Sequence, residues 1–104
     1  MKNEIMPKTS FLKIMGATPV NRVIDFLIEN DRDSWTMKEI SDNANIGYST
    51  LKIILPRMIK REIITIKKKV GTSNLYVINK ENPVVNKIYE LYNTINKQEI
   101  MALA

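Results

Sequence analysis

The sequence predicts a mainly α-helical chain with one small β-hairpin, an α+β fold, and three observations carry this prediction. An apolar stripe at helical spacing follows Thr18 and Pro19, a typical N-cap and first helical residue. Two further helices are predicted on either side of a short turn at Asn45. Two β-branched runs then flank the residues GTSN, which is typical of a hairpin. At 104 residues the chain is long enough for one domain with a modest core.

The composition is that of a globular protein, with 44% hydrophobic and 26% charged residues. No stretch approaches the roughly 18 apolar residues of a membrane span, and the first ten residues lack the apolar core of a signal peptide. The chain has no cysteine and no histidine, so thiolate metal sites, disulfides and the commonest general base are excluded. We therefore expect a cytoplasmic protein with no cofactor, no metal site and no enzymatic activity. Its carboxylates lie on predicted helix faces or loops, without a phosphate-binding loop or nucleophile motif.

The basic residues are concentrated in one part of the chain. Residues 45–80 contain eight lysines and arginines and a single acid, Glu62, so this segment carries a charge of +7 and the rest of the chain −2, for a net charge of +5. Scattered lysines would indicate only a solvated surface, whereas one basic block indicates a polyanionic partner.

The N-terminal part is predicted to hold two helices. Residues 1–9 show no period and are expected to be flexible, and residues 10–15 form a short helix that Gly16 ends. The next helix begins at Pro19 and ends at Asn30 and Asp31, and its buried stripe comprises Val20, Val23, Ile24, Leu27 and Ile28.

A helix-turn-helix follows. Thr36 and Glu39 form a capping box at the start of a short helix, Asn45 suits the left-handed residue after it, and Gly47 caps a helix over residues 48–61. Pro56 lies inside that last helix, where proline removes a backbone hydrogen bond. Its predicted position on the outer side favours a continuous, kinked helix over a break.

The C-terminal part is predicted to hold a hairpin and one more helix. Strand-like residues 63–70 and 75–78 flank the turn 71–74, and Trp35 is expected to anchor an earlier strand-like segment to this hairpin. Residues 79–83 link the hairpin to a helix with a heptad-like apolar stripe. Either this helix pairs with its symmetry mate in a homodimer, which we favour, or the stripe folds back on its own core. The residues expected at the dimer interface are Phe11, Leu12, Met15, Val85, Ile88, Tyr89, Tyr92 and Ile95.

The order of these elements resembles the small winged helix-turn-helix transcriptional regulators common in archaea. The resemblance rests on four segments that together span most of the chain: "GATPVNRVIDFLIEN", "EISDNANIGYSTLKIILPRMIKREII", "GTSNLYVIN" and "NPVVNKIYEL". One departure is Glu62, where relatives often carry glycine just before the strand. The resemblance implies a winged helix-turn-helix DNA-binding domain over residues 10–82 and a dimerisation helix and tail over residues 83–104.

The resemblance also implies which residues meet DNA. The helix over residues 48–61 would enter the major groove, and the basic wing over residues 67–74 would contact phosphates or the minor groove. Two less specific interpretations stay open: the helix face is only a solvated surface, and the lysines only protect an edge strand from aggregation. The expected DNA-binding residues are Thr36, Lys38, Tyr48, Ser49, Thr50, Lys52, Ile53, Arg57, Lys60, Lys67, Lys68, Lys69, Thr72, Ser73 and Asn74.

Two functional hypotheses follow. The first is a sequence-specific regulator that binds double-stranded DNA as a homodimer, with no small-molecule effector evident and no membrane partner. The alternative is a non-specific architectural or plasmid-partition DNA binder, or a winged-helix protein-interaction module. The basic block argues against a role in protein binding alone.

Overall fold

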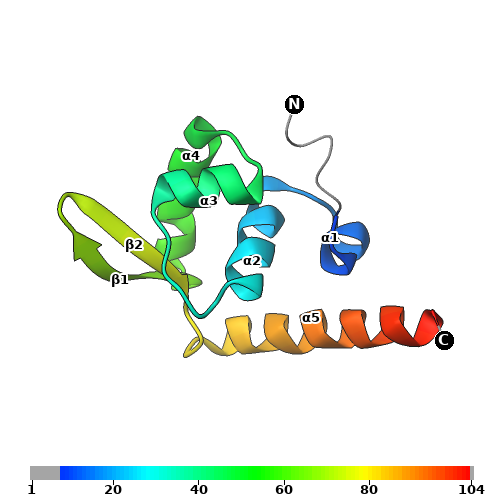
Figure 1. Ribbon diagram of the computed structural model, residues 1–104. Coiled ribbons are helices and arrows are strands. Elements are labelled where there is room, and N and C mark those ends of the chain that lie inside the picture. The colour runs from blue at the N-terminus through cyan, green and yellow to red at the C-terminus, as the bar shows by residue number, and fades with distance from the viewer. Residues whose placement is uncertain (1–7, 104) are drawn as a thin grey trace.

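The computed structural model describes residues 8–103, in which five α-helices accompany a two-stranded antiparallel sheet (Figure 1). The predicted α+β class, mainly helical with one small hairpin, is confirmed. Most of the segment predicted to be flexible, residues 1–7, lies outside the described residues, as does Ala104. The elements in chain order are α1 (Ser10–Met15), α2 (Pro19–Glu29), α3 (Met37–Ala44), α4 (Tyr48–Lys60), β1 (Ile64–Val70), β2 (Ser73–Ile78) and α5 (Pro83–Ala102).

The helices begin where the capping residues predicted. Thr18 caps α2 with Pro19 in its first turn, and the capping box at α3 is complete, since Thr36 and Glu39 each accept a hydrogen bond from the other's backbone amide. Asn45 adopts the left-handed conformation after α3, with φ 59°. Asn82 caps α5 by accepting a hydrogen bond from the amide of Val84.

The core lies where α2, α3 and α4 meet the hairpin. Leu27, Ile40 and Leu51, one from each helix, are at most 1% exposed, and Ile64 of β1 is fully buried. The predicted stripe of α2 is buried except at its first residue. Val20 is 38% exposed because it lies in the first turn of α2, at the edge of the core.

α4 runs through Pro56 without a break, as predicted, and Pro56 is exposed. The helix ends in a tight left-handed turn at Glu62, whose φ is 60°. The amide of Ile63 donates to the carbonyl of Met58 at 3.0 Å, and the amide of Glu62 donates to that of Ile59 at 2.9 Å. This ending is the Schellman arrangement, in which glycine is usual at the residue occupied here by Glu62.

The hairpin is held to the helices through Trp35. The amide of Trp35 donates to the carbonyl of Tyr76 at 3.0 Å, and the amide of Tyr76 donates back at 2.8 Å. The Trp35 ring also packs edge-on against Phe26, with ring centroids 5.1 Å apart. The predicted anchoring of the hairpin by Trp35 is therefore confirmed. The turn is shorter than predicted, since β2 already begins at Ser73 and only Gly71 and Thr72 lie between the strands.

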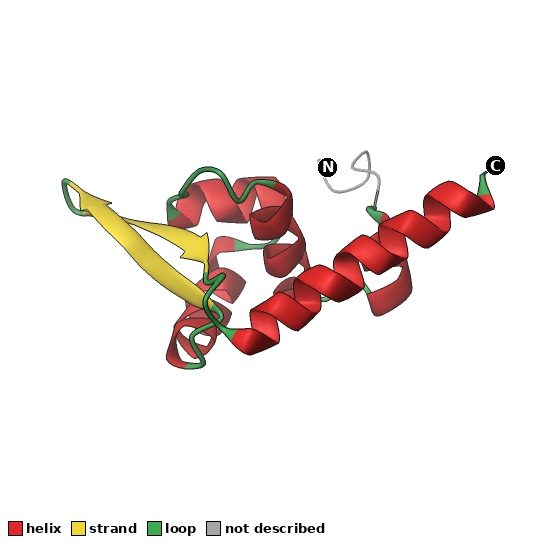
Figure 2. Ribbon diagram, turned by 90° about the horizontal axis from the view of Figure 1, so that it is seen from below, coloured by secondary structure: helices red, strands yellow, loops and turns green. Residues whose placement is uncertain are grey.

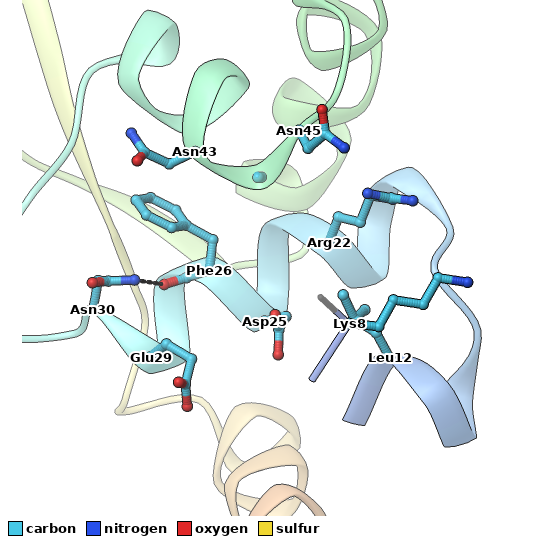
Figure 3. Close-up of a pocket in the computed structure, with 10 residues that line it drawn as sticks. Lys8, Leu12, Arg22, Asp25, Phe26, Glu29, Asn30, Asn43 and Asn45 are labelled. Carbon is cyan, nitrogen blue, oxygen red and sulfur yellow. Dashed lines mark hydrogen bonds between the residues drawn. The ribbon is translucent and has the colours of Figure 1, made fainter. Parts of the chain in front are cut away.

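α5 packs along α1 and α2 (Figure 2). Val85, Tyr92 and Ile95 are between 0% and 4% exposed, and the Tyr92 ring lies 5.2 Å from that of Phe11. The Tyr92 hydroxyl lies 3.0 Å from Asp25 Oδ1 and 2.6 Å from Glu29 Oε2, two side chains that α2 directs toward α5 (Figure 3).

This packing corrects the role predicted for the stripe of α5. Of the expected dimerisation residues, Phe11, Leu12, Val85, Tyr92 and Ile95 are buried in the chain's own core, and Ile88 and Tyr89 pack against it. Met15 is the one exposed residue of this set, with 45% of its surface accessible. The stripe folds back because α1 and α2 offer it apolar side chains and hydrogen-bond acceptors within the same chain. Homodimer formation itself stays a prediction, and it would need other residues.

No helix in the described part of the chain combines the length and apolar character that crossing a membrane requires.

Candidate nucleic-acid interface

The exposed side of α4 carries the residues that the sequence placed there. Leu51, Leu55 and Met58 are buried and Ile54 is half-buried, which fixes the core-facing side of the helix. The opposite side presents exposed side chains along the whole length of the helix, namely Ser49, Lys52, Ile53, Pro56, Arg57 and Lys60. At the start of the helix Tyr48 is 49% exposed, and Ile53 is 59% exposed. Thr50 is half-buried, so it contributes less to this surface than predicted.

The cations of α4 and of the hairpin have no ionic partners among the residues that the structure describes. Across residues 8–103 the ion pairs join Lys38 to Asp42, Lys80 to Asp31, and Lys87 to Glu90. None of them involves the exposed cations that we call the basic face: Lys52, Arg57, Lys60, Arg61, Lys67, Lys68 and Lys69. Unpaired like charges on one surface repel one another and attract a polyanion.

Lys80 differs from the rest of the basic block. Its ammonium lies 3.0 Å from Asp31 Oδ2 and 5.9 Å from the centre of the Tyr89 ring. The Tyr89 hydroxyl donates to the same carboxylate oxygen at 2.7 Å, and together with Lys80 it lowers the pKa of Asp31. Lys80 therefore links the end of the hairpin to Asp31, which follows α2, and to Tyr89 of α5.

A β-bulge changes which faces of the hairpin the lysines occupy. Ile66 pairs with Tyr76 while Lys68 pairs with Leu75, so Lys67 is an extra residue in β1. Because side chains alternate along a strand, regular pairing would leave Lys67 and Lys69 on one face. The bulge instead places Lys69, opposite Asn74, on the same face as Ile66 and Tyr76.

A cleft connects the hairpin tip with the starts of α3 and α4. It has a volume of about 430 Å³, and Met37 and Tyr76 line it together with six predicted DNA-binding residues, namely Thr36, Lys38, Tyr48, Thr72, Ser73 and Asn74. A neighbouring groove of about 490 Å³ separates α4 from the hairpin. Met37, Leu55 and Tyr76 form its apolar lining, and Lys52 and Lys60 of α4 also line it. The two hollows share Met37, Asn74 and Tyr76, so eight of the predicted DNA-binding residues lie around adjoining hollows.

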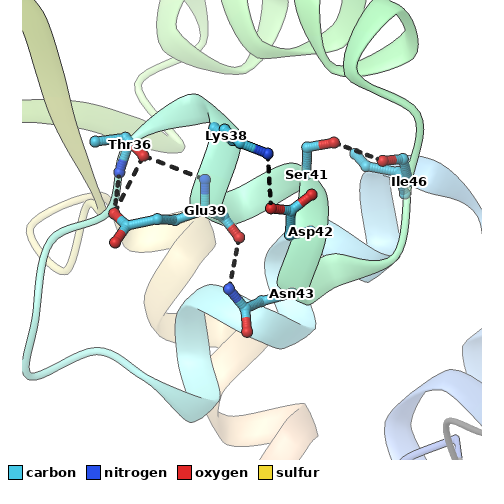
Figure 4. A network of polar contacts seen from close by, with 7 residues as sticks. All are labelled: Thr36, Lys38, Glu39, Ser41, Asp42, Asn43 and Ile46. Carbon is cyan, nitrogen blue, oxygen red and sulfur yellow. Dashed lines mark hydrogen bonds and ion pairs between the residues drawn. The ribbon is translucent and has the colours of Figure 1, made fainter. Parts of the chain in front are cut away.

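Two predicted residues are already engaged within α3 (Figure 4). The Thr36 hydroxyl takes part in the capping box, since it accepts from the Glu39 amide at 3.2 Å. The Lys38 ammonium lies 3.1 Å from Asp42 Oδ2. These contacts make Thr36 a capping residue first, and Lys38 a weaker candidate than the unpaired cations of α4.

Two exposed residues beside this surface, Arg61 and Ile66, are not among the predicted DNA-binding residues, although Arg61 was counted in the basic block and in the end of the helix expected to face phosphates. Arg61 is exposed one residue beyond the helical end of α4, next to Arg57 in a shallow apolar pocket. Its position directly after Lys60 was a signal that it shares the basic face. Ile66 is 47% exposed on the hairpin face that lines the groove beside α4. Strand alternation places Ile66 on the same face as the buried Ile64, so this signal was available in the sequence.

The chain was compared with protein-family models, curated proteins and solved structures, and none of them matches it.

Proposed function

We propose that the chain is a winged helix-turn-helix protein that binds double-stranded DNA and regulates transcription from within the cytoplasm. In this proposal α3 and α4 form the helix-turn-helix, α4 enters the major groove, and the β1–β2 hairpin is the wing. The protein acts by occupying a site on DNA and by blocking or recruiting the transcription machinery there, without catalysis. The observation that carries the proposal is the basic face, a set of exposed cations on α4 and the hairpin that form no ion pair within the described part of the chain.

The shape of α4 supports major-groove binding. A B-DNA major groove is about 12 Å wide and admits one α-helix. The outer side of α4 has exposed residues over its full length, so nothing in the described chain covers it. Tyr48 and Ser49 in its first turn offer hydroxyls to base edges, and Ile53 offers an apolar contact for a thymine methyl group. Arg57 and Lys60 lie in the last turns, where phosphates would neutralise them.

The hairpin supports a second contact with the DNA backbone. Lys67, Lys68 and Lys69 are exposed next to the two-residue turn. Each phosphate that a lysine neutralises adds about 0.9 to the slope of log K against log salt. Sequence preference should therefore come from α4, and much of the salt dependence from the hairpin.

The first experiment selects a preferred duplex from random DNA and then measures affinity for it and for a scrambled duplex at two salt concentrations. We expect tight, salt-dependent binding with a clear preference for the selected duplex. Binding without salt dependence and without preference would overturn the proposal.

Paired substitutions separate specific from architectural binding. Lys52→Ala with Arg57→Ala should reduce the preference for the selected duplex, whereas Lys67→Ala with Lys69→Ala should weaken both duplexes equally and lower the salt slope. The matched control is Lys87→Ala with Lys97→Ala, which removes the same charge from exposed positions on α5. Uniform weakening by both basic-face pairs would favour a non-specific architectural binder. Affinity unaffected by any pair would favour a protein-interaction module.

A homodimer remains part of the proposal, because two copies would place two recognition helices on a palindromic site. Its interface must lie outside the buried stripe of α5. Exposed apolar side chains are available on α1 and at the end of α5, where Ile14, Ile100 and Met101 are 56%, 69% and 69% exposed. Light scattering after gel filtration, with and without a palindromic duplex, measures the number of copies in the complex.

A further inference from the structure

A polar pocket of about 270 Å³ lies between α1, α2 and the end of α3, away from the basic face (Figure 3). Oppositely charged side chains line it: Lys8 and Arg22 carry positive charge, while Asp25 and Glu29 are acids. Although they share one pocket, no ion pair joins these four residues to one another or to any other described residue. Nothing in the sequence pattern marked this pocket, since its walls come from three separate segments.

One side of the pocket is rich in hydrogen-bond donors. Asn45 Nδ2 is buried there, and among the described residues it has no hydrogen-bond partner. Figure 3 shows the Arg22 guanidinium below Asn45 and the Lys8 ammonium beyond it. Arg22 uses its Nε to donate to the carbonyl of Ala17 at 2.9 Å, and no hydrogen bond to another described residue engages its terminal nitrogens. A buried amide donor without an acceptor is costly, and beside two cations its natural partner is an anionic oxygen.

The other side of the pocket is acidic. Asp25 and Glu29 lie one helical turn apart on α2 and are joined through the Tyr92 hydroxyl. The hydroxyl has one proton, so it can donate to only one of the two carboxyls at a time. Burial raises the pKa of Asp25, whose carboxyl accepts hydrogen bonds from the Thr9 and Tyr92 hydroxyls. Glu29 also accepts from the Tyr92 hydroxyl, and its exposed carboxylate lies at the rim of the pocket.

We propose that this pocket binds a small zwitterion, a free amino acid, with its carboxylate at Asn45, Arg22 and Lys8 and its ammonium at Glu29. In Figure 3 Asn45 and Arg22 lie at one side of the pocket and Glu29 at the other, as the two ends of such a ligand require. The Phe26 side chain also lines the pocket and provides apolar surface for the ligand's side chain. Pockets for drug-sized ligands measure about 300–1,000 Å³, so the smaller volume here suits a compact ligand.

The pocket reaches the turn between α3 and α4. Asn45 caps the end of α3, and α4 begins three residues later at Tyr48. A ligand held by Asn45 would therefore bias the position of α4, and its effect on DNA affinity would rest on the proposed function. Binding of the ligand itself does not depend on that function.

Titration calorimetry of the full chain, without DNA, tests the site. The probes are the twenty common free amino acids, each at millimolar concentration, with propionate and propylamine as ligands that carry one end only. We expect saturable binding of some amino acids and at least tenfold weaker binding of propionate and propylamine. If no amino acid binds, or if the single-ended probes bind as tightly, the proposal is overturned.

Two variants locate the binding site. Asn45→Gly removes the amide while keeping a residue that tolerates the left-handed backbone, and Glu29→Gln removes the charge while keeping an acceptor for Tyr92. Each should weaken the binding of the amino acid at least tenfold. Arg32→Gln and Glu90→Gln remove charges from exposed positions outside the pocket and should leave binding unchanged. Unchanged affinity in either pocket variant, with thermal melting showing a folded chain, contradicts the site.

Discussion

The two sides of the molecule use their polar side chains in opposite ways. At the junction of α1, α2 and α5, the acids are engaged: Tyr92 contacts Asp25 and Glu29, and Tyr89 contacts Asp31. On the basic face, the cations have no ionic partners among the described residues, and α4 contains a proline and ends on a strained residue. The first side contributes stability, whereas the second retains features that reduce it.

Under the proposed function, this contrast marks the side of the molecule that would meet DNA. Where a protein departs from local preferences, such as helix propensity or backbone conformation, the departure is expected at functional or strained sites. Pro56 inside a helix, Glu62 at a positive φ and the unpaired lysines of β1 all lie on α4 or next to it. Substitutions on the first side should therefore affect mainly stability, and substitutions on the basic face mainly DNA affinity.

The largest expected effect comes from truncating one tyrosine on each side. Tyr92→Ala should lower the free energy of unfolding by about 3–5 kcal/mol, because it removes a buried aromatic ring from the core. Tyr48→Ala, at a position that is 49% exposed, should change it by no more than about 0.5 kcal/mol. Urea unfolding measures both values.

The order of the two tyrosine variants should reverse for DNA affinity, with Tyr48→Ala losing more affinity than Tyr92→Ala. Tyr48→Ala should weaken binding to the selected duplex about fivefold by removing one hydrogen bond. Tyr92→Ala, measured below its unfolding midpoint, should bind almost as tightly as the original chain. A stability loss of equal size in both variants would show that the two sides do not differ as described.

Pro56→Ala tests the cost of proline within the basic face. Pro56 has no amide hydrogen, so the carbonyl of Lys52 lacks its partner within the helix. Alanine restores this hydrogen bond, and the free energy of unfolding should rise by about 2 kcal/mol. Lys60→Ala, elsewhere on the exposed side of α4, should change the stability by no more than about 0.5 kcal/mol. A destabilised Pro56→Ala variant would mean that proline suits this position better than a regular helix does.

Local signals made much of the fold predictable from sequence. The capping box at Thr36, the left-handed Asn45 and Pro19 in the first turn of α2 all appear in the structure because each depends only on neighbouring residues. The exposed face of α4 was predictable for the same reason, since helical periodicity separates Lys52 and Arg57 from Leu51 and Leu55.

Features that depend on distant residues were not predictable in this way. The α5 stripe is suited to either a second copy or its own core, and the decision rests on the contact of Tyr92 with Phe11 and Asp25. The bulge at Lys67 depends on strand register, which the sequence pattern of β1 does not specify. The polar pocket joins Lys8, Asp25 and Asn45, residues that are brought together only by the packing of three helices.

Glu62→Gly should produce a smaller gain in stability than Pro56→Ala. A glycine adopts a φ of 60° without strain, so the free energy of unfolding should rise by about 1 kcal/mol. The side-chain Nδ2 groups of Asn79 and Asn82 each donate to the backbone carbonyl of Glu62 at 2.9 Å, and glycine keeps both contacts. Glu62→Gln is the matched control, since it removes the negative charge and keeps the strain. Equal stabilisation by both variants would assign the effect to charge and not to the backbone.

The smallest effects are expected from two amide substitutions that differ in their dependence on pH. Burial raises the pKa of Asp25, so its contribution to stability is complete at low pH and is lost as the pH rises through the raised pKa. The hydrogen bond from Tyr89 lowers the pKa of Asp31, so its contribution is present at neutral pH and is lost as the pH falls through the lowered pKa. Relative to the original chain, Asp25→Asn should therefore gain stability as the pH rises from acid to neutral, and Asp31→Asn should lose it.

The surroundings of the two carboxyls explain why these trends should differ in sign. Asp25 faces the Thr9 and Tyr92 hydroxyls, with Glu29, Lys8 and Arg22 lining the same pocket, and it lacks an ion pair among the described residues. An asparagine there keeps the hydrogen-bonding shape of the protonated acid, whereas an asparagine at position 31 loses the attraction to Lys80. Thermal melting at several pH values measures both trends, with Asp33→Asn as an exposed control. Parallel trends for Asp25→Asn and Asp31→Asn would show that the buried acid on α2 is held in its charged form, and the acidic side of the molecule would then store a charge that its tyrosines stabilise.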